Sequence, residues 1–404
     1  MSKKELMLLG VGDMIVDTTQ PDAPFELVAP LFRSAAAVVG QGELPFTSRG
    51  VNTFPDLNYS SLPCNPENIK ALVNAGFDVI TTASNHTWDS GAPGVEDTIN
   101  GLKAAGLASC GAGMNLEEAR QPAVIEREGT KFGFLAYNCS GPRGSWATKK
   151  KPGCAYVDAC VSYEEGTPTI GGIPIVRTFA EPESLKAMEE DIRKLRPQCD
   201  VLVISFHKGL GYIPARLADF EQQISYAAID AGADVIFSHH AHILKGVETY
   251  KGKAIFHGLG NFVTVCEVDH ENYFRYGSFI KMGKGHPKSK SESAEDQKKH
   301  TQELLRNHGG PFVFEAGGKP CAFPPREINM TMIAKCMIED GKIVKAGYLP
   351  CLINEHGQPE ILKHDDERGQ QVYEYIENIS NAIDLNVEFA WEGDDVIVTD
   401  PTLK

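Results

Sequence analysis

The sequence predicts a layered α/β protein, and three observations support this fold class. Short apolar runs that read as buried strands alternate with helix-length segments through the first two thirds of the chain. The 404 residues suffice for one large α/β domain with elaborations or for two domains. The composition, with 42% hydrophobic and 23% charged residues, is that of an ordinary soluble globular protein.

The first elements are predicted from these apolar runs and from helix boundary signals. The run at 5–13 predicts a strand that ends at Asp13, and the segment 25–35 predicts a helix. A second strand follows, and its apolar run stops before Glu43. The segment 66–76 predicts a helix, because it begins with proline and glutamate and ends at a glycine.

Later elements continue the alternation. A strand is predicted at 131–138, and a long charged helix at 181–197 leads into a strand that reaches His207. The segment 218–232 predicts the next helix, which ends at a glycine before another apolar strand. That strand is followed by three histidines within four positions, namely His239, His240 and His242.

Two of the predicted helix-to-strand units resemble each other. Each has an Ala-Gly helix end, an aspartate, a Val-Ile strand and a histidine eight residues past the aspartate. The pairs are Asp78 with His86, and Asp234 with His242. We expect these units to lie side by side in one sheet, each with a histidine at its carboxyl end.

The character of the chain changes after about Val265. We divide it into a core at 1–265, a polar, lysine-rich insertion or lid at 266–325, and a C-terminal region at 326–404. Two strands joined at Asp340-Gly341 predict a hairpin in the last region, followed by a helix and a strand. We expect the hairpin to extend the main sheet.

Charge and targeting signals restrict the functional classes. The formal net charge of −15 argues against a nucleic-acid partner or an anionic membrane surface, because the long-range field repels polyanions. The N-terminal apolar run is too short for a signal peptide, and no stretch approaches a membrane span. Ten cysteines without C-x-x-C spacing fit reduced thiols. We therefore expect a cytoplasmic protein, and the sequence does not indicate its oligomeric state.

Polar side chains gather where the predicted strands end. Ligands of open α/β sheets bind outside the carboxyl ends of the strands, so these side chains are candidates for one site. They are Asp13, Glu43, Asn85, His86, His207, His239, His240 and His242. Carboxylates and imidazoles without a thiolate suit Mn²⁺, Fe²⁺, Zn²⁺ or Mg²⁺, as one ion or as two.

Several short stretches carry a resemblance to a known family. They are "GD" at Gly12-Asp13, "GE" at Gly42-Glu43, "SNHTWDSG", "FHKG" and "HHAHILKGVETYKGKAIFHGLGNF". From about Met7 to Val263 the chain resembles the CapA family, which is named for poly-γ-glutamate capsule proteins. That family belongs to the calcineurin-like metallophosphoesterase superfamily.

The resemblance implies a fold and a set of site residues. The expected fold is a four-layer αββα sandwich with a dinuclear metal centre at one edge. Asp13 and His242 would bind the first metal, and Glu43 would bridge the two. Asn85, His207 and His240 would bind the second metal. His86 matches the proposed general acid, so the expected catalytic residues are His86, His207 and His240, with one or two ions of Mn, Fe or Zn.

The chain departs from the superfamily pattern in ways that bear on the first metal. Ile15 stands where a histidine usually follows the first aspartate, and Glu43 replaces the bridging aspartate, as is usual in CapA-like chains. Many relatives have tryptophan and glutamate where this chain has Lys208 and Gly211. These departures leave open whether the first site holds an ion.

Residues around the histidines are candidates for substrate contact and support. Arg143, Trp146 and Lys208 are the candidates for binding an anionic substrate. Asp89 is expected to orient His86 or to cap a turn rather than bind metal. His239 and Asn261 are expected to support the site.

These inferences favour a metal-dependent hydrolase that uses activated water on an amide or phosphoester. The family name points to a small anionic, peptide-like substrate such as a γ-glutamyl compound. An epimerase or isomerase that uses the same histidines, with one metal or none, is the first alternative. It predicts exchange of solvent deuterium into the substrate without bond cleavage. A non-catalytic partner in polymer synthesis is the second alternative, and it predicts no bound metal.

Overall fold

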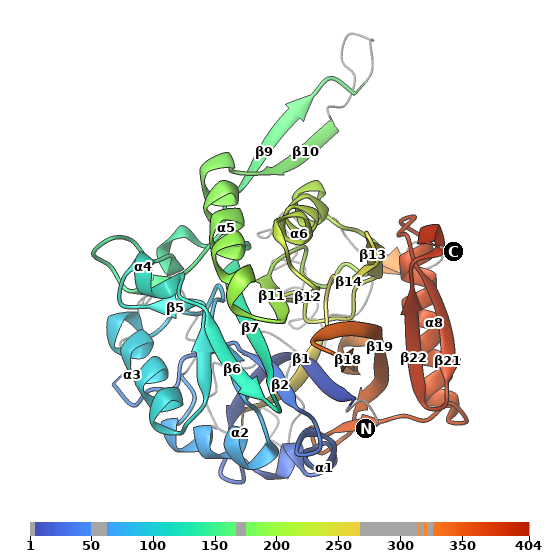
Figure 1. The fold of residues 1–404 in the computed structure, drawn as a ribbon, viewed down its shortest axis with the longest axis horizontal. Coiled ribbons are helices and arrows are strands. Elements are labelled where there is room, and N and C mark those ends of the chain that lie inside the picture. The colour runs from blue at the N-terminus through green and yellow to red at the C-terminus, as the bar shows by residue number, and fades with distance from the viewer. Residues whose placement is uncertain are drawn as a thin grey trace.

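The computed structural model describes residues 5–49, 63–166, 175–266, 314–315, 319–320 and 326–403. Within these residues, two sheets form the centre of the molecule and helices cover their outer faces (Figure 1). The larger sheet has ten strands in the order β21-β22-β19-β18-β1-β2-β3-β4, with β15 beside β1 and β20 beside β19. The smaller sheet has six strands in the order β13-β14-β12-β11-β7-β6.

The bounds of the elements are as follows. The larger sheet contains β1 (Leu6–Asp17), β2 (Ala37–Gly42), β3 (Val79–Thr81), β4 (Ala108–Cys110), β15 (Asn261–Cys266), β18 (Met330–Glu339), β19 (Lys342–Ile353), β20 (Pro359–Ile361), β21 (Glu388–Glu392) and β22 (Asp395–Thr399). The smaller sheet contains β6 (Ala123–Arg127), β7 (Thr130–Asn138), β11 (Val201–His207), β12 (Val235–His239), β13 (Val247–Tyr250) and β14 (Lys253–Phe256). Three short pairs are β5 (Ala112–Gly113) with β8 (Gly153–Cys154), β9 (Ala159–Glu164) with β10 (Ile175–Ala180), and β16 (Phe314–Glu315) with β17 (Lys319–Pro320).

The α-helices are α1 (Ala29–Phe32), α2 (Ile69–Ala75), α3 (Gly91–Ala104), α4 (Leu116–Ala119), α5 (Pro182–Leu195), α6 (Asp219–Ala231) and α8 (Glu367–Asn381). Helix α2 ends at Gly76 and α6 at Gly232, as their sequences predict, and both glycines have positive φ. Among the described helices, none combines the length and the apolar character that crossing a bilayer requires.

Side chains that alternate between the two faces of the strands form three buried hydrophobic clusters among the described residues. One core cluster lies between the sheets and includes Val39 of β2 with Val203 of β11 and Phe237 of β12. The opposite face of the larger sheet packs against α1, α2 and α3, and the opposite face of the smaller sheet packs against α5 and α6. The predicted four-layer αββα sandwich is therefore confirmed.

The two sheets approach closely where β1 crosses β12. A Cβ at Gly10 would lie 2.5 Å from the ring of Phe237, so a side chain there would force the sheets apart. The predicted C-terminal hairpin turns at Asp340 and Gly341, which both have positive φ. Its strand β18 pairs antiparallel with β1, so the hairpin extends the larger sheet as expected.

Four details differ from the sequence-based expectations. The two similar units around Asp78 and Asp234 do not lie side by side in one sheet, because β3 belongs to the larger sheet and β12 to the smaller one. The first strand does not end at Asp13 but continues to Asp17, because the distant strand β15 pairs with its second half. The helix predicted over 25–35 is broken into a 3₁₀ turn at Ala23–Phe25 and the short α1, since Pro30 cannot continue a preceding helix. Helix α3 was not expected, because its first turn holds two glycines and a proline.

Most of the predicted insertion or lid at 266–325 lies outside the described residues, so that prediction stays a prediction. The described strands β9 and β10 form a two-stranded ribbon that extends from the body beside α5 (Figure 1).

Candidate metal centre

The predicted ligands meet at one edge of the two sheets, and Asp13 lies at the centre of the group. It stands inside β1, where the pairing with β2 shifts register between Gly10 and Asp13. Its backbone N–H donates to the carbonyl oxygen of Gly260 over 3.0 Å. A Cβ at the preceding Gly12 would lie 1.9 Å from that same oxygen. The position of Asp13 therefore depends on a residue without a side chain at position 12.

Asp13, Glu43 and His242 form the most compact set of ligand atoms. One ligand atom from each lies within 4.8 Å of the other two. Nε2 of His242 is 3.3 Å from Oε1 of Glu43, and Nδ1 of His242 is 4.0 Å from Oδ2 of Asp13. Both carboxylates are buried. These three residues are the ligands expected for the first metal. Occupancy of that first site is the point that Ile15, in place of a histidine, leaves open.

The loop after β12 holds its histidines through an unusual backbone. His240 and His242 both have positive φ, at 83° and 57°, a conformation that non-glycine residues rarely adopt. In this conformation the backbone N–H of His240 donates to Oδ2 of Asp13 over 2.9 Å. Nδ1 of His242 is 2.8 Å from Oδ1 of Asn261. Because an amide oxygen only accepts, Nδ1 of His242 carries the proton and its Nε2 is left with a lone pair.

The residues expected at a second metal also come together. Nε2 of His207 is 2.6 Å from Oδ1 of Asn85, and the rings of His207 and His240 lie 4.9 Å apart. Nδ1 of His207 is 3.7 Å from Oδ1 of Asp13, which connects this group to the first. His239 lies at the same place, with Nδ1 3.9 Å from Oδ1 of Asp13.

Buried polar atoms without a hydrogen bond gather in this cluster. Among the described residues, they include Asp13 Oδ1, Glu43 Oε2, His207 Nδ1, His239 Nδ1 and His240 Nδ1. A buried polar group without a partner is costly, so a concentration of such groups calls for a ligand. Oxygen and imidazole donors in this mixture fit a divalent cation such as Mn²⁺, Fe²⁺ or Zn²⁺. The donor set therefore fits the predicted metal.

Burial sets the protonation of these groups in the metal-free protein. Burial, followed by repulsion from Glu43, raises the pKa of Asp13 to about 8, and burial raises the pKa of Glu43 to about 7. Burial also lowers the pKa of His239 and of His240 to about 3. The imidazoles are thus neutral and available as ligands, while a bound cation would displace protons from the carboxyl groups.

His86 differs from the other histidines of this cluster because its pKa is raised rather than lowered in the metal-free protein. Burial lowers its pKa, but the hydrogen bond and charge of Asp89, together with Glu43 and Asp13, outweigh this effect and raise it to about 8. Nδ1 of His86 is 2.5 Å from Oδ2 of Asp89, and Nε2 is 3.8 Å from Oε1 of Glu43. Asp89 thus orients His86, and the charged imidazole at the partly exposed rim of the cluster can donate a proton.

The three residues predicted to bind substrate have other contacts. The Lys208 side chain is fully buried and its ammonium reaches α6, because successive side chains of a strand point to opposite faces. The geometry gives no support to its predicted contact with an anionic substrate. Arg143 is paired with Asp158 at 2.7 Å, and Trp146 stacks on Tyr156 with ring centroids 4.2 Å apart. Substrate contact by Arg143 or Trp146 stays a prediction.

Sequence reasoning missed two features next to the histidines. Tyr212 stacks on His242, with ring centroids 5.5 Å apart and planes inclined by 23°. His257 is fully buried, and its two nitrogens lie 3.0 Å from Nζ of Lys208 and 2.8 Å from Oε2 of Glu248. Tyr212 follows the strand-end His207 by five positions, so a search of the whole loop would have included it. No local pattern distinguishes His257 from an ordinary core residue.

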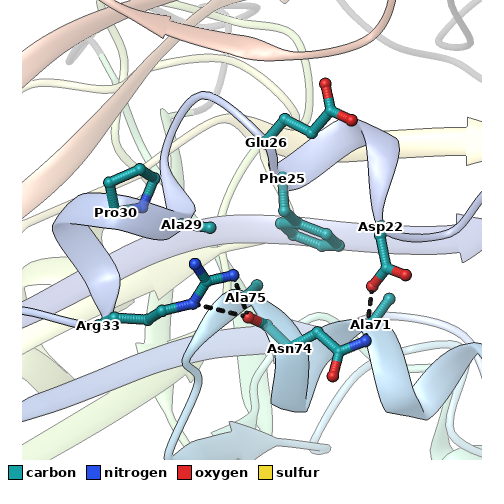
Figure 2. A pocket seen from close by; sticks show the side chains of 9 residues that line it. All are labelled: Asp22, Phe25, Glu26, Ala29, Pro30, Arg33, Ala71, Asn74 and Ala75. Carbon is teal, nitrogen blue, oxygen red and sulfur yellow. Dashed lines mark hydrogen bonds between the residues drawn. The ribbon is translucent and has the colours of Figure 1, made fainter.

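A separate hollow of about 470 Å³ lies over α1 and α2 (Figure 2). Its polar groups bond to each other: the Arg33 guanidinium donates to the Asn74 carbonyl oxygen, and the Asn74 amide donates to Asp22. Phe25, Ala71 and Ala75 of its lining belong to the cluster on the outer face of the larger sheet. None of its lining residues belongs to the predicted metal centre.

We expect Asp13 and Glu43 to make the free energy of unfolding of the metal-free protein fall as the pH rises from about 5 to about 8, relative to a variant in which neither group titrates. The buried histidines, whose pKa values are lowered, act in the opposite direction in both proteins. Asp13 and Glu43 have raised pKa values in the folded protein and ordinary values of 3.8 and 4.5 otherwise. At these two groups the folded state therefore holds more protons than the unfolded state in this range, and loss of those protons favours unfolding. The raised pKa of His86 acts in the same direction.

Urea unfolding in the presence of a chelator measures this slope. The double variant Asp13→Asn/Glu43→Gln is the control, because it keeps the size of both side chains but removes their titration, and the wild-type stability should fall relative to it over this pH range. Equal slopes in the two proteins would contradict the raised pKa values of these carboxyl groups.

Comparison with known proteins places the chain in a family. The sequence pattern of the family described as bacterial capsule synthesis protein PGA_cap matches residues 6–265. The PGA biosynthesis protein CapA of Bacillus subtilis (strain 168) is 29% identical over 260 residues, which cover 64% of this chain and 61% of that protein. A probable polyglutamine synthesis accessory protein of Mycobacterium tuberculosis is 29% identical over 219 residues, covering 53% of this chain and 51% of the relative.

This chain thus aligns with less than two thirds of the length of these curated relatives. Among solved structures, the calcineurin-like phosphoesterase YfkN from Bacillus subtilis superimposes with a TM-score of 0.41 at 13% identity, covering 95% of this chain and 98% of the other. The match of the family pattern extends from the start of β1 into β15 and includes every predicted metal ligand. The chain therefore belongs to the bacterial capsule synthesis protein PGA_cap family.

Proposed function

We propose that this protein is a metal-dependent hydrolase that acts on an anionic, peptide-like substrate, with a γ-glutamyl amide as the preferred class and a phosphoester as the other. One observation carries the proposal: buried, unpaired oxygen and imidazole atoms converge at Asp13, Glu43 and the histidine loop, and His86 lies beside them with Nε2 3.8 Å from Glu43. A set of cation ligands next to an imidazole that Asp89 orients is suited to metal-dependent hydrolysis with a general acid.

The residues divide the chemistry among them. A divalent cation held by Asp13, Glu43 and His242, with a second held by Asn85, His207 and His240, would supply a Lewis acid and activate water. His86 would give its Nε2 proton to the leaving group, since Asp89 engages Nδ1. Asp89 would then stabilise the positive charge whenever the imidazole regains its proton. Because the cluster is buried, its charges interact more strongly than they would in water.

The substrate class follows from the family rather than from the site. The Bacillus subtilis relative is named for PGA biosynthesis, and a relative that shares the same region is named as an accessory protein. The first name favours a carboxylated γ-glutamyl substrate. The second favours a non-catalytic role in polymer synthesis, which is the competing proposal and predicts no turnover.

The test is metal reconstitution followed by turnover assays. The protein is stripped with a chelator and loaded with Mn²⁺, Fe²⁺ or Zn²⁺. It is then assayed with γ-glutamyl peptides of increasing length and with p-nitrophenyl phosphate. We expect one or two ions per chain and metal-dependent release of glutamate or of p-nitrophenol.

The variant His86→Gln serves as the control for the acid, because it retains a polar side chain without a titrating proton. It should bind metal like the wild type but hydrolyse about 10²- to 10⁴-fold more slowly. No metal above trace levels would overturn the proposal and favour the non-catalytic role. Bound metal without cleavage of either substrate class would overturn hydrolysis of these substrates, and solvent deuterium in uncleaved substrate would favour an epimerase.

A further inference from the structure

The loop at 208–218, between β11 and α6, is held in place by two buried lysines. Lys208 is fully buried, and its three ammonium protons have three acceptors: Glu221 O at 2.9 Å, Ser225 Oγ at 3.0 Å and His257 Nδ1 at 3.0 Å. Because Lys208 donates to Nδ1, the Nε2–H of His257 donates to Glu248 at 2.8 Å. The start of the loop is therefore held from within the core.

A second buried lysine holds the far part of the same loop. Lys245 is fully buried, and its ammonium donates to the carbonyl oxygens of Ile213 and Arg216. Two backbone bonds add to this attachment: Lys208 N–H donates to His239 O over 3.2 Å, and Tyr212 N–H donates to Ala241 O over 2.9 Å. The loop therefore follows the position of the segment 239–242, which carries His240 and His242.

This attachment determines where Tyr212 lies. Tyr212 has a φ of 58°, which costs free energy for a non-glycine residue and persists only where the surroundings enforce it. In that conformation its ring stacks against the His242 imidazole, with the centroids 5.5 Å apart. Asn261 fixes the edge of the same imidazole through Nδ1. Together the two contacts leave His242 Nε2 directed at Glu43, 3.3 Å away.

We propose that Tyr212 is a positioning residue for the metal centre: its stacked ring, held by the loop that Lys245 fastens, fixes the imidazole plane of His242 and thereby strengthens divalent cation binding at Asp13, Glu43 and His242. This inference rests on the metal centre of the proposed function but not on any particular reaction. Residues that orient metal ligands typically contribute about 10- to 100-fold to metal affinity.

The test compares Tyr212→Ala with Tyr212→Phe in the full-length protein, using Mn²⁺ as the probe. Isothermal titration should give a dissociation constant for the ion at the Asp13 site about 10-fold or more weaker for Tyr212→Ala. It should give a value near that of the wild type for Tyr212→Phe, because phenylalanine keeps the ring. In the metal-free protein, ¹⁵N-histidine NMR should show the Nδ1-protonated form of His242 in the wild type and in Tyr212→Phe, and averaged nitrogen signals in Tyr212→Ala.

Tyr373→Ala is the matched control, since Tyr373 stacks on Trp391 with nearly the same geometry, 5.6 Å and 23°, in the C-terminal region. It should lose stability without losing Mn²⁺ affinity. Lys245→Met should reproduce the Tyr212→Ala phenotype if it folds. Equal Mn²⁺ affinity and equal His242 signals in Tyr212→Ala and wild type would overturn the inference. Tight Mn²⁺ binding with no hydrolysis in the wild type would overturn the proposed function alone.

Discussion

Asp13→Asn is expected to abolish metal-dependent hydrolysis and to weaken binding of the first cation. Substitutions of residues that only orient metal ligands typically reduce metal affinity by roughly 10- to 100-fold, and loss of Asp13 itself should reduce it by more. Asp13 is the residue that both groups of ligands share, because His207 and His239 face its Oδ1 while the His240 N–H and His242 face its Oδ2. An asparagine of the same shape keeps one oxygen but presents an amide nitrogen, which cannot bind a cation. Mn²⁺ titration and turnover of the reconstituted protein measure both effects.

The same substitution should leave the metal-free fold intact. Burial holds the Asp13 carboxyl group in its neutral form up to a pKa of about 8, so a neutral amide imposes no new charge on the interior. The thermal midpoint in chelator should equal or exceed that of the wild type. Asp158→Asn is the control, because Asp158 pairs with exposed Arg143 outside the ligand set, and it should bind Mn²⁺ normally. Wild-type metal affinity in Asp13→Asn would refute the assignment of this centre.

Gly12→Ala is expected to have the largest effect on stability of any single methyl addition near the site. The new Cβ would lie 1.9 Å from the carbonyl oxygen of Gly260, and backbone atoms cannot yield as a flexible side chain can. We expect a loss of at least about 1–3 kcal/mol in the free energy of unfolding, the usual cost of overpacking a core. Displacement of Gly260 would also move Asn261, which orients His242, so metal affinity should fall together with stability.

Gly144→Ala provides the comparison for this substitution. A Cβ at Gly144 would meet no atom within 4 Å, and the residue lies at the same edge of the molecule, in the turn after β7. Its free energy of unfolding, measured by urea titration, should change by no more than about 0.5 kcal/mol. Equal stability of the two variants would show that β1 and the segment around Gly260 can separate without cost.

The sequence grouped the candidate ligands better than it predicted the elements that carry them. Residue type and position at predicted strand ends were enough to group Asp13, Glu43 and the histidines, which the structure brings together, because chemistry restricts which side chains bind cations. That they bind a metal stays a prediction. The continuation of β1 to Asp17 was not predictable in this way. It depends on pairing with β15, about 250 residues away along the chain, and local periodicity carries no information about such a partner.

The sequence did not indicate where the Lys208 side chain points. Its position next to His207 suggested contact with an anionic substrate, but adjacent side chains along a strand point to opposite faces. Its partners are a helix carbonyl and His257, which lie far apart in the sequence. Tyr212 was missed for a related reason. Side chains in an irregular loop do not alternate or repeat at a fixed spacing, so the sequence does not indicate which way the tyrosine ring points.

The origin of the donor atoms has a consequence for metal selectivity. The larger sheet and the loops that follow its strands supply the oxygens, from Asp13, Glu43 and Asn85, whereas the smaller sheet and its loops supply the nitrogens, from His207, His240 and His242. Oxygens alone suit hard ions such as Mg²⁺ and Ca²⁺, and imidazoles alone suit softer ions such as Zn²⁺ and Cu²⁺. A cation of intermediate character would thus bind ligands from both sheets at once. The distance between the two sheets would then influence which ion binds best. A substitution in the core between the sheets, remote from every ligand, would change that preference.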